Sequence, residues 1–235
     1  MIDVHCHFDL AKNPGRYISD NERKRIITIG MTNLPSHFIL GVNHIQKYRY
    51  VRLALGLHPL RAKEHFKEYS KFSECVKQTS YIGEVGLDFS REGISTKQTQ
   101  IESFEYVLDC VKDKQKILSL HSRRAEKEIL HMLIEKKIKN AIFHWYSGPI
   151  SLLNRIIDSG YYFSINSAMV KSENGIKIIK MIPKEIILTE TDFPFIDGSD
   201  ILLIYKHLSI LWGVTEIEVE NLIESNYKRL IGNIS

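Results

Sequence analysis

The chain has 235 residues, 43% of them hydrophobic, and carries a formal charge of +4 at pH 7 with a sequence pI near 8.8. This length and apolar content fit one large α/β domain, and the mild positive charge tolerates a polyanionic ligand without requiring one. Because the three cysteines lack disulfide-type spacing and the apolar runs are only strand-length, the composition excludes a disulfide scaffold and a membrane-spanning protein, and we expect a cytoplasmic one.

Strand-like runs alternate with segments of helical periodicity along the whole chain. The predicted strands cover Ile2–His7, Arg25–Gly30, Tyr50–Leu57, Tyr81–Gly86, Ile117–His121, Asn140–His144, Gly160–Ile165 and Glu185–Thr189. Eight alternations in a chain of this length are typical of a closed parallel barrel rather than an open sheet. The sequence therefore predicts an α/β fold of the (β/α)8 TIM-barrel type, with residues 1–235 forming a single domain.

Helices are predicted between these strands, for example over Ser95–Lys112. Ser95 and Gln98 have the spacing of a capping box, in which two side chains bond reciprocally to the backbone where a helix begins. Thr215 and Glu218 have the same spacing and predict the start of a helix near the end of the chain.

The first predicted strand ends in two histidines one residue apart, His5 and His7. Side chains alternate between the two faces of a strand, so both imidazoles point the same way and can bind one metal ion. Two solvated strand-end histidines would look the same, and this pair alone is weak evidence for a metal site.

Most of the other strands also end in residues that bind metals. The histidines and acids at or near these C-terminal ends are His58, Glu84, His121, His144 and Asp192. Each has an ordinary explanation by itself, as a core histidine, a strand-end charge or a turn residue. A hydrophobic strand has no structural reason to end in this way repeatedly, and TIM barrels carry their active sites at this end. The pattern therefore predicts a metal centre at the mouth of the barrel.

Mixed imidazole and carboxylate donors of this number suit two divalent cations better than one, with Mg²⁺, Mn²⁺ and Zn²⁺ as candidates. The predicted ligands are His5, His7 and Asp192 for one ion, His121 and His144 for the other, and Glu84 as a bridge between them. Two ions about 3.5–4 Å apart would activate a shared water, and Asp192 would take its proton as general base. The predicted reaction class is metal-assisted hydrolysis, with Asp192 and Glu84 as catalytic residues.

Basic and aromatic residues that follow strands are candidate contacts for a polyanion. Lys12, Arg16 and Arg123 follow strands and could track a phosphate backbone. Trp145 and Tyr146 follow His144 and could stack unpaired bases, at about 1–3 kcal/mol each. Other basic residues, Lys136, Lys137 and Lys139, precede a strand and should lie at the opposite end of the barrel as ordinary solvated charges.

Taken together, these blocks resemble the TatD family of metal-dependent deoxyribonucleases, a branch of the amidohydrolase-like TIM barrels. The matching segments are residues 3–9, 56–59, 82–88, 121–123, 143–148 and 190–194. The resemblance implies a divalent-metal nuclease that acts on single-stranded DNA from the 3′ end. It implies the same six metal ligands, His5, His7, Glu84, His121, His144 and Asp192. It also implies that His58 and Arg123 face the phosphates of the substrate.

The sequence departs from the family pattern after Asp192, where residues 195–200 replace a longer loop and lead almost directly into the last helices. Arg124 also stands where relatives carry an acidic residue. A chain trimmed in this way is similar to TatD-like proteins of the Qat anti-phage defence systems. That similarity implies other proteins of such a system as partners.

Two alternative functions remain open at this point. A different metal-dependent amidohydrolase would cleave a cyclic amide or a lactone, but related barrels with that chemistry often bridge their metals with a lysine, and strands 4 and 5 offer none in place. A weakly catalytic subunit of a defence complex would retain the metal site, and the shortened loop after Asp192 is consistent with this reading.

Overall fold

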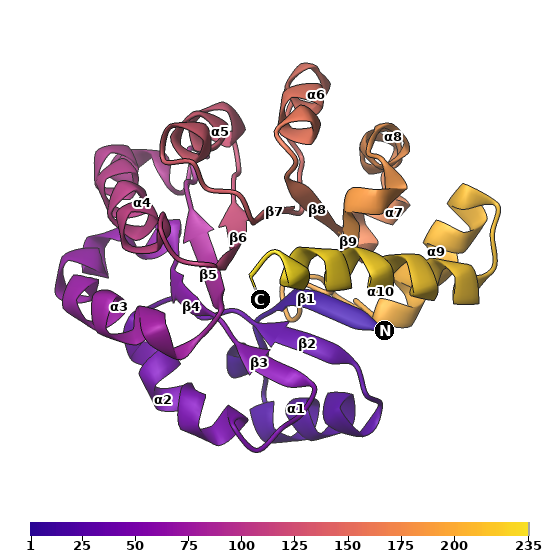
Figure 1. The fold of residues 1–235 in the computed structure, drawn as a ribbon, viewed down its shortest axis with the longest axis horizontal. Helices are drawn as coiled ribbons and strands as arrows, with labels where there is room; N and C mark the ends of the chain where they lie inside the picture. The colour runs from indigo at the N-terminus through magenta and orange to yellow at the C-terminus, as the bar shows by residue number, and fades with distance from the viewer. Residues whose placement is uncertain (235) are drawn as a thin grey trace.

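Parallel strands alternate with helices throughout residues 1–234, which are the residues that the computed structural model describes (Figure 1). The strands are β1 (Ile2–Cys6), β2 (Ile27–Gly30), β3 (Val51–Leu53), β4 (Leu55–Leu57), β5 (Tyr81–Gly86), β6 (Ile117–His121), β7 (Ala141–His144), β8 (Tyr162–Ile165) and β9 (Ile187–Thr189). The α-helices are α1 (Pro14–Arg23), α2 (Pro35–Ile45), α3 (Tyr69–Cys75), α4 (Lys97–Val111), α5 (Glu126–Glu135), α6 (Ile150–Asp158), α7 (Ser167–Lys171), α8 (Glu173–Met181), α9 (Ile201–Trp212) and α10 (Glu216–Gly232). Short 3-10 helices are η1 (Phe8–Leu10), η2 (Pro59–Lys67), η3 (Val76–Gln78), η4 (Ile94–Thr96) and η5 (Lys184–Ile186).

The strands pair in chain order, β1 to β3 in one ladder and β4 to β9 in the other. The strand predicted over residues 50–57 is interrupted at Ala54 and divides into β3 and β4. Thr32 inserts here, because its hydroxyl donates to the Ala54 carbonyl at 2.9 Å and accepts from the Gly56 amide at 3.0 Å. A Cβ atom at Gly56 would lie 1.6 Å from the Thr32 carbonyl oxygen, so only glycine fits. The prediction of one continuous strand is therefore wrong.

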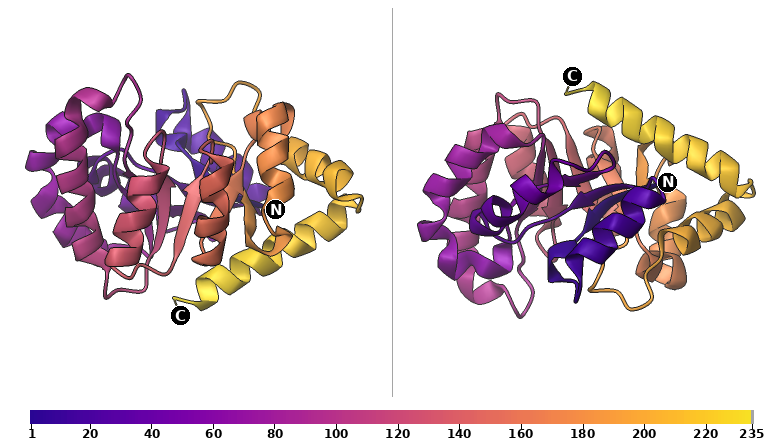
Figure 2. Two further views of the ribbon diagram at one scale, coloured as in Figure 1. Left: turned by 90° about the horizontal axis from the view of Figure 1, so that it is seen from above. Right: turned by 90° about the horizontal axis from the view of Figure 1, so that it is seen from below.

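The segment after β9 lies against β1 and closes the barrel. The Asp192 amide donates to the His5 carbonyl at 2.9 Å, and the His7 amide donates to the Phe193 carbonyl at 2.6 Å. All neighbouring strands within the two ladders pair in parallel. The predicted TIM barrel is confirmed, and Figure 1 shows its helices around the strands, while Figure 2 shows the same barrel from the side.

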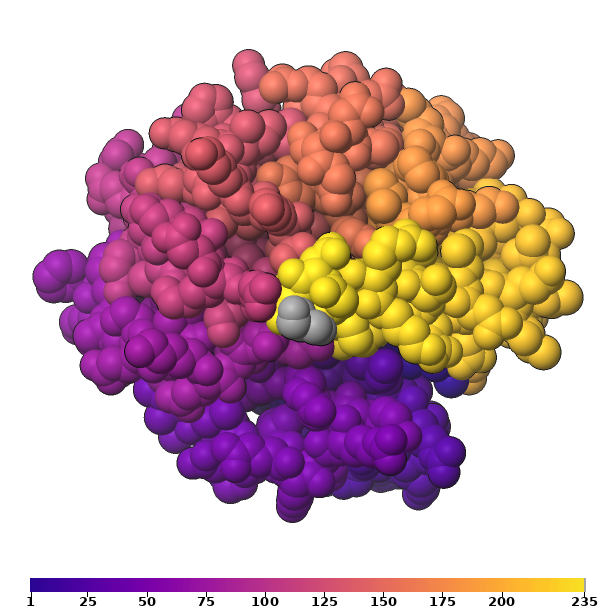
Figure 3. Space-filling view, in the orientation of Figure 1, coloured from indigo at the N-terminus to yellow at the C-terminus, as the bar shows by residue number. Residues whose placement is uncertain are grey.

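The last helix, α10, covers the end of the barrel where the strands begin. The Asn226 amide donates to the Ile187 carbonyl at 2.8 Å, and the Tyr227 and Tyr81 hydroxyls are 2.6 Å apart. Tyr227 and Leu230 also line a small cavity of about 10 Å³ inside the barrel, between strands β1, β2, β5, β6 and β7. Figure 3 shows α10, in yellow, over the middle of this face. The polar strand ends predicted to form the site lie at the other end.

Helix starts agree with the sequence at one predicted capping box and disagree at the other. Thr215 and Glu218 form the reciprocal bonds of a capping box at the start of α10. The box predicted at Ser95 is wrong, because α4 begins only at Lys97 after the 3-10 turn η4. The Gln98 side chain instead donates to Glu102 along the helix surface.

Buried apolar side chains of the strands and of the surrounding helices form one large core cluster. A smaller cluster of Ile29, Met31 and Ala54 lies beside it. None of the helices within residues 1–234 has the length and apolar character needed to cross a lipid bilayer.

Candidate metal centre

The C-terminal ends of the strands bring the predicted ligands together in one cluster beneath a cavity, whose lining includes the other ligands but not the fully buried His5 and His7. His5 lies within β1, Glu84 within β5, and His121 and His144 are the last residues of β6 and β7. His7, His58 and Asp192 follow β1, β4 and β9, respectively. These side chains come from segments up to 187 residues apart and meet only because the barrel closes.

Glu84 lies at the middle of this cluster and is 2% exposed. Five imidazoles surround its carboxylate, with nearest nitrogen–oxygen distances of 2.6 Å for His121, 3.1 Å for His7, 3.2 Å for His58, 3.3 Å for His144 and 3.6 Å for His5. Burial would raise the pKa of Glu84, but the surrounding histidines outweigh it and hold the pKa well below its usual range. Glu84 is therefore an anion that several strands share.

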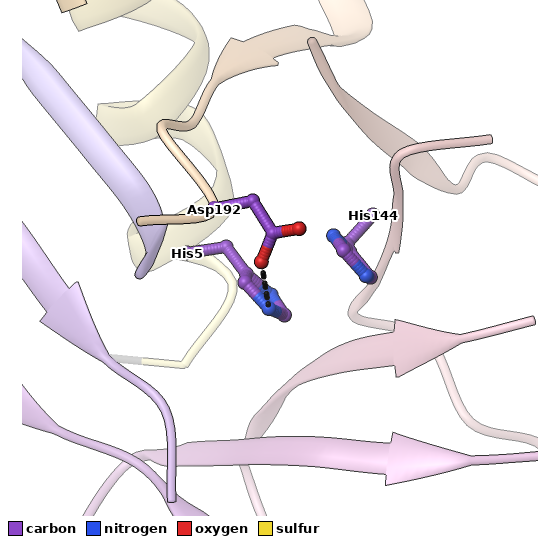
Figure 4. Close-up of side chains that lie close together, drawn as sticks. All are labelled: His5, His144 and Asp192. Carbon is purple, nitrogen blue, oxygen red and sulfur yellow. Dashed lines mark ion pairs between the residues drawn. The ribbon is translucent and has the colours of Figure 1, made fainter. Parts of the chain in front are cut away.

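Asp192 and two stacked histidines form one side of the cluster (Figure 4). The His5 and His144 rings are parallel, with centroids 3.8 Å apart, and Asp192 Oδ1 lies 3.7 Å from His5 Nε2. Burial raises the pKa of Asp192 to about 7 and lowers that of His5 to about 4. These three side chains can place one ligand atom each within 4.8 Å of one another.

The hydrogen bonding of the cluster tests whether it fits metal ions. His5 Nε2 and both ring nitrogens of His7 are buried and form no hydrogen bond within residues 1–234. A buried polar atom without a partner costs about 1–3 kcal/mol, so an apo cluster of this kind is unfavourable. One carboxylate also has too few lone pairs for five ring nitrogens. Divalent cations would satisfy these atoms, and imidazole and carboxylate are donors that such cations accept.

The grouping of possible ligands differs from the predicted division. The structure forms three compact sets, which are His5 with His144 and Asp192, His5 with His7 and Glu84, and His58 with Glu84 and His121. His121 and His144, predicted to share an ion, fall in different sets, and their ring centroids are 6.1 Å apart. His58, expected to face phosphate, reaches the shared carboxylate as well.

Two further acids, Glu190 and Asp88, contact histidines of the cluster. The sequence alone assigns a role to neither. Glu190 is fully buried, with Oε1 3.2 Å from His144 Nδ1 and 2.9 Å from the Asn166 amide that donates to it, while the Ser164 hydroxyl donates to Oε2. Asp88 Oδ2 lies 2.7 Å from His121 Nε2. The signal available in the sequence was an acid within two residues of the end of a buried strand, Glu190 directly after β9 and Asp88 two residues after β5.

These acids change the charge of the histidines that they contact. Burial would lower the pKa of His121 and of His144. For His121, the contacts with Glu84 and Asp88 outweigh burial and raise the pKa to about 9. Glu190 and Glu84 similarly raise the pKa of His144 well above its usual value. A carboxylate behind a histidine also selects which ring nitrogen carries the proton.

The cavity above the cluster has a volume of about 470 Å³. Its walls include three of the predicted substrate contacts, His58, Arg123 and Trp145. Arg123 lies 3.5 Å from Glu92 at the edge of this cavity, and Trp145 is 36% exposed. Arg123 and Trp145 can therefore reach a ligand in the cavity.

The predicted substrate contact at Tyr146 is wrong. Its side chain is 1% exposed, and its ring packs against Phe143 and Phe163 beneath the surface. The hydroxyl donates to the Pro149 carbonyl at 2.8 Å. Trp145 has a positive φ of 41°, which turns the chain so that consecutive aromatic side chains diverge. Adjacency in the sequence therefore does not place both rings in the cavity.

A parallel α/β barrel that gathers histidines and carboxylates at its strand ends defines the class of metallo-dependent hydrolases. The model of the TatD-related DNase family matches residues 2–232, and the chain belongs to this family. It is therefore a metal-dependent hydrolase of the TatD type.

Similar proteins span most of the chain. An uncharacterized metal-dependent hydrolase of Methanocaldococcus jannaschii is 27% identical over 97% of this chain and 94% of its own length. A protein named deoxyribonuclease Tat-D from Schizosaccharomyces pombe is 33% identical over 66% of this chain and 55% of its own. A crystal structure of a TatD homologue from Escherichia coli K12 superposes with a TM-score of 0.83 at 21% identity, covering 98% and 97% of the two chains. This structural likeness concerns the fold.

Proposed function

We propose that residues 1–235 form one catalytic domain that hydrolyses phosphodiester bonds of DNA, acting on single strands from the 3′ end. The observation that carries this proposal is the crowding of five imidazoles around Glu84 at the floor of an open cavity. The cavity has the size of a small-molecule or nucleotide site, and Arg123 supplies positive charge at its edge. The family and the named deoxyribonuclease among its relatives support DNA as the substrate.

The proposed ligands of two divalent ions are the six side chains His5, His7, Glu84, His121, His144 and Asp192. His58 is close enough to Glu84 to join them or to contact a phosphate oxygen. When bound, Mg²⁺, Mn²⁺ or Zn²⁺ supplies the positive charge that makes the phosphorus of a diester more reactive toward water. Glu84 belongs to two of the three ligand sets and would help to hold both ions.

Asp192 is the proposed general base. Its carboxylate lines the cavity and lies 3.7 Å from His5 Nε2 and 3.9 Å from His7 Nε2, two imidazoles that also contact Glu84. Water attacks phosphorus as Asp192 accepts a proton, a phosphorus–oxygen bond breaks, and the leaving oxygen takes up a proton. Arg123 and His58 neutralise the phosphate during this step, and Trp145 stacks on a neighbouring base.

The test is digestion of end-labelled DNA and RNA oligonucleotides by the purified chain with added Mg²⁺, Mn²⁺ or Zn²⁺. We expect single-stranded DNA labelled at its 5′ end to yield a ladder of products that shorten from the 3′ end. Cleavage of RNA alone would overturn the proposed substrate, and internal cleavage would overturn the proposed direction.

The same assay run on small lactones separates the alternative amidohydrolase activity. Lactone hydrolysis without DNA cleavage would replace the proposal. A cytoplasmic location and partners from an anti-phage defence system stay predictions, and a weakly catalytic role there would show as biological activity that survives Asp192→Asn.

A further inference from the structure

A second cavity lies beside the metal centre, between the segment that follows β1 and the loop that follows β9. Its volume is about 520 Å³, and its apolar lining includes Leu10, Tyr17, Phe193 and Pro194. Figure 2 shows the loop after β9 beside the start of α1. We refer to this cavity as the flanking groove. No residue of the flanking groove belongs to the proposed ligand set.

The flanking groove begins where the catalytic cavity ends. Phe193 follows Asp192 directly, its carbonyl accepts the His7 amide at 2.6 Å, and its ring stacks on Tyr17 with centroids 4.6 Å apart. Two residues further on, Phe195 lines the catalytic cavity and is 61% exposed. One short segment, residues 193–195, therefore separates the two spaces.

The edge of the flanking groove carries positive charge. Lys12 and Arg16 are both exposed and line it, and Lys12 has no ion pair within residues 1–234. Asp20 lies at the same edge, but its carboxylate is 2.9 Å from Arg23 and only 3.9 Å from Arg16. The groove thus combines an apolar floor with two cations, Lys12 without an ion pair in the described residues and Arg16 with one long contact to Asp20, and a nucleotide has the matching chemistry of a flat base and an anionic phosphate.

We propose that the flanking groove binds one nucleotide of the substrate strand next to the one at the metal centre. Its base lies against Leu10 and the exposed edge of the Phe193–Tyr17 stack, and its phosphate contacts Lys12 and Arg16. This inference rests on the proposed nuclease function and extends it, because it gives the enzyme a reason to prefer a polynucleotide over a short diester.

The test compares the parent with the double variant Lys12→Ala/Arg16→Ala on two substrates. For a single-stranded DNA 12-mer we expect KM to rise about tenfold at low salt while kcat is unchanged. The slope of log KM against log salt concentration should fall by about 1.4, since each lost contact to a single strand removes about 0.7. Hydrolysis of bis-p-nitrophenyl phosphate, which is too small to reach the groove, should be unchanged.

Two variants act as controls. Lys137→Ala/Lys139→Ala removes the same charge from the cavity at the opposite end of the barrel, and we expect the KM and salt slope of the parent. Leu10→Ser changes an apolar side chain that is 45% exposed, and it should raise KM for the 12-mer without changing the salt slope.

The outcomes separate this inference from the proposed function. A parent that cleaves neither DNA nor the small diester overturns the nuclease proposal itself. An active parent whose Lys12→Ala/Arg16→Ala variant keeps the same KM and salt slope overturns the flanking groove alone. An equal loss in Lys137→Ala/Lys139→Ala would also overturn it, because the effect would then be one of net charge.

Discussion

The two ends of the barrel differ in how many of their buried polar atoms are hydrogen-bonded. Where the strands begin, α10 closes the barrel through the Asn226 amide, which donates to the Ile187 carbonyl, and through the Tyr227 and Tyr81 hydroxyls, and a single buried acceptor on α10, Asn226 Oδ1, lacks a partner within residues 1–234. Where the strands end, buried nitrogens of His5 and His7 lack hydrogen bonds. The end covered by α10 contributes to the stability of the fold. The end where the strands finish leaves ring nitrogens without partners, and a bound ligand can satisfy them. The difference teaches that function in this fold is concentrated where several unsatisfied buried nitrogens gather around one carboxylate.

The largest effect should come from Asp192→Asn at the strand ends. We expect kcat for DNA to fall by about 10²–10⁴-fold from loss of the general base alone, while the melting temperature is retained because the amide fills the same space. Rate assays and thermal unfolding measure the two quantities. The control Asp197→Asn alters an exposed acid in the following loop and should keep full activity. Turnover of Asp192→Asn equal to the parent would refute this assignment.

At the opposite end, Leu230→Ala should cost stability rather than activity. Leu230 is fully buried on α10, and truncation of such a side chain lowers the free energy of unfolding by about 2–5 kcal/mol. Urea unfolding measures this loss, and the folded variant should bind Mn²⁺ as the parent does. Ile217→Ala, on the same helix at 70% exposed, is expected to change stability by less than about 0.5 kcal/mol. Weakened metal binding in folded Leu230→Ala would break the contrast between the two ends.

Substitution of Glu190 tests whether the acids that contact the histidines contribute to metal binding or only to the stability of the fold. We expect Glu190→Ala to weaken Mn²⁺ binding about 10–100-fold, because His144 loses the carboxylate that orients its ring. Glu190→Gln keeps an acceptor without the charge and should fall between the parent and Glu190→Ala. Calorimetric titration of the folded protein measures the affinity. A lower melting temperature with unchanged affinity would identify Glu190 as purely structural.

Glu68 offers the smallest effect and a matched control for Glu190. This buried acid forms its hydrogen bonds outside the cluster, where it accepts the Ser36 amide at 2.8 Å and the Lys71 ammonium at 2.6 Å. Burial would raise its pKa, but these bonds outweigh burial and hold the pKa below 4.5. Glu68→Gln should leave Mn²⁺ affinity unchanged and cost about 1 kcal/mol of stability at pH 7.

The pH dependence of that cost has a definite sign. Because the folded pKa of Glu68 is depressed, its carboxylate stabilises the fold above the unfolded pKa, and this contribution is lost as the pH falls through the folded value. The difference between Glu68→Gln and the parent should therefore shrink in strongly acidic urea titrations. A constant difference between pH 7 and the acid limit would contradict the ion-pair explanation.

Patterns within short segments were enough to predict the strands, the barrel and the six proposed ligands. His5 and His7 follow from strand alternation, and His121 and His144 follow from their place at strand ends. The predictions that are wrong depend on contacts with residues from other segments of the chain. Thr32 interrupts the third strand, and Tyr146 is buried against Phe163 of β8. Short segments do not encode those contacts.

The sequence by itself determined which residue types stand at the strand ends, because hydrophobic periodicity and strand alternation are local properties of the chain. Only the tertiary structure decided that His58 joins the histidines around Glu84, that His5 stacks on His144, and that Glu190 lies behind them. The physical reason is that closure of the barrel sets the distances between strands that are remote in sequence. Side-chain geometry at its mouth is a property of that closure.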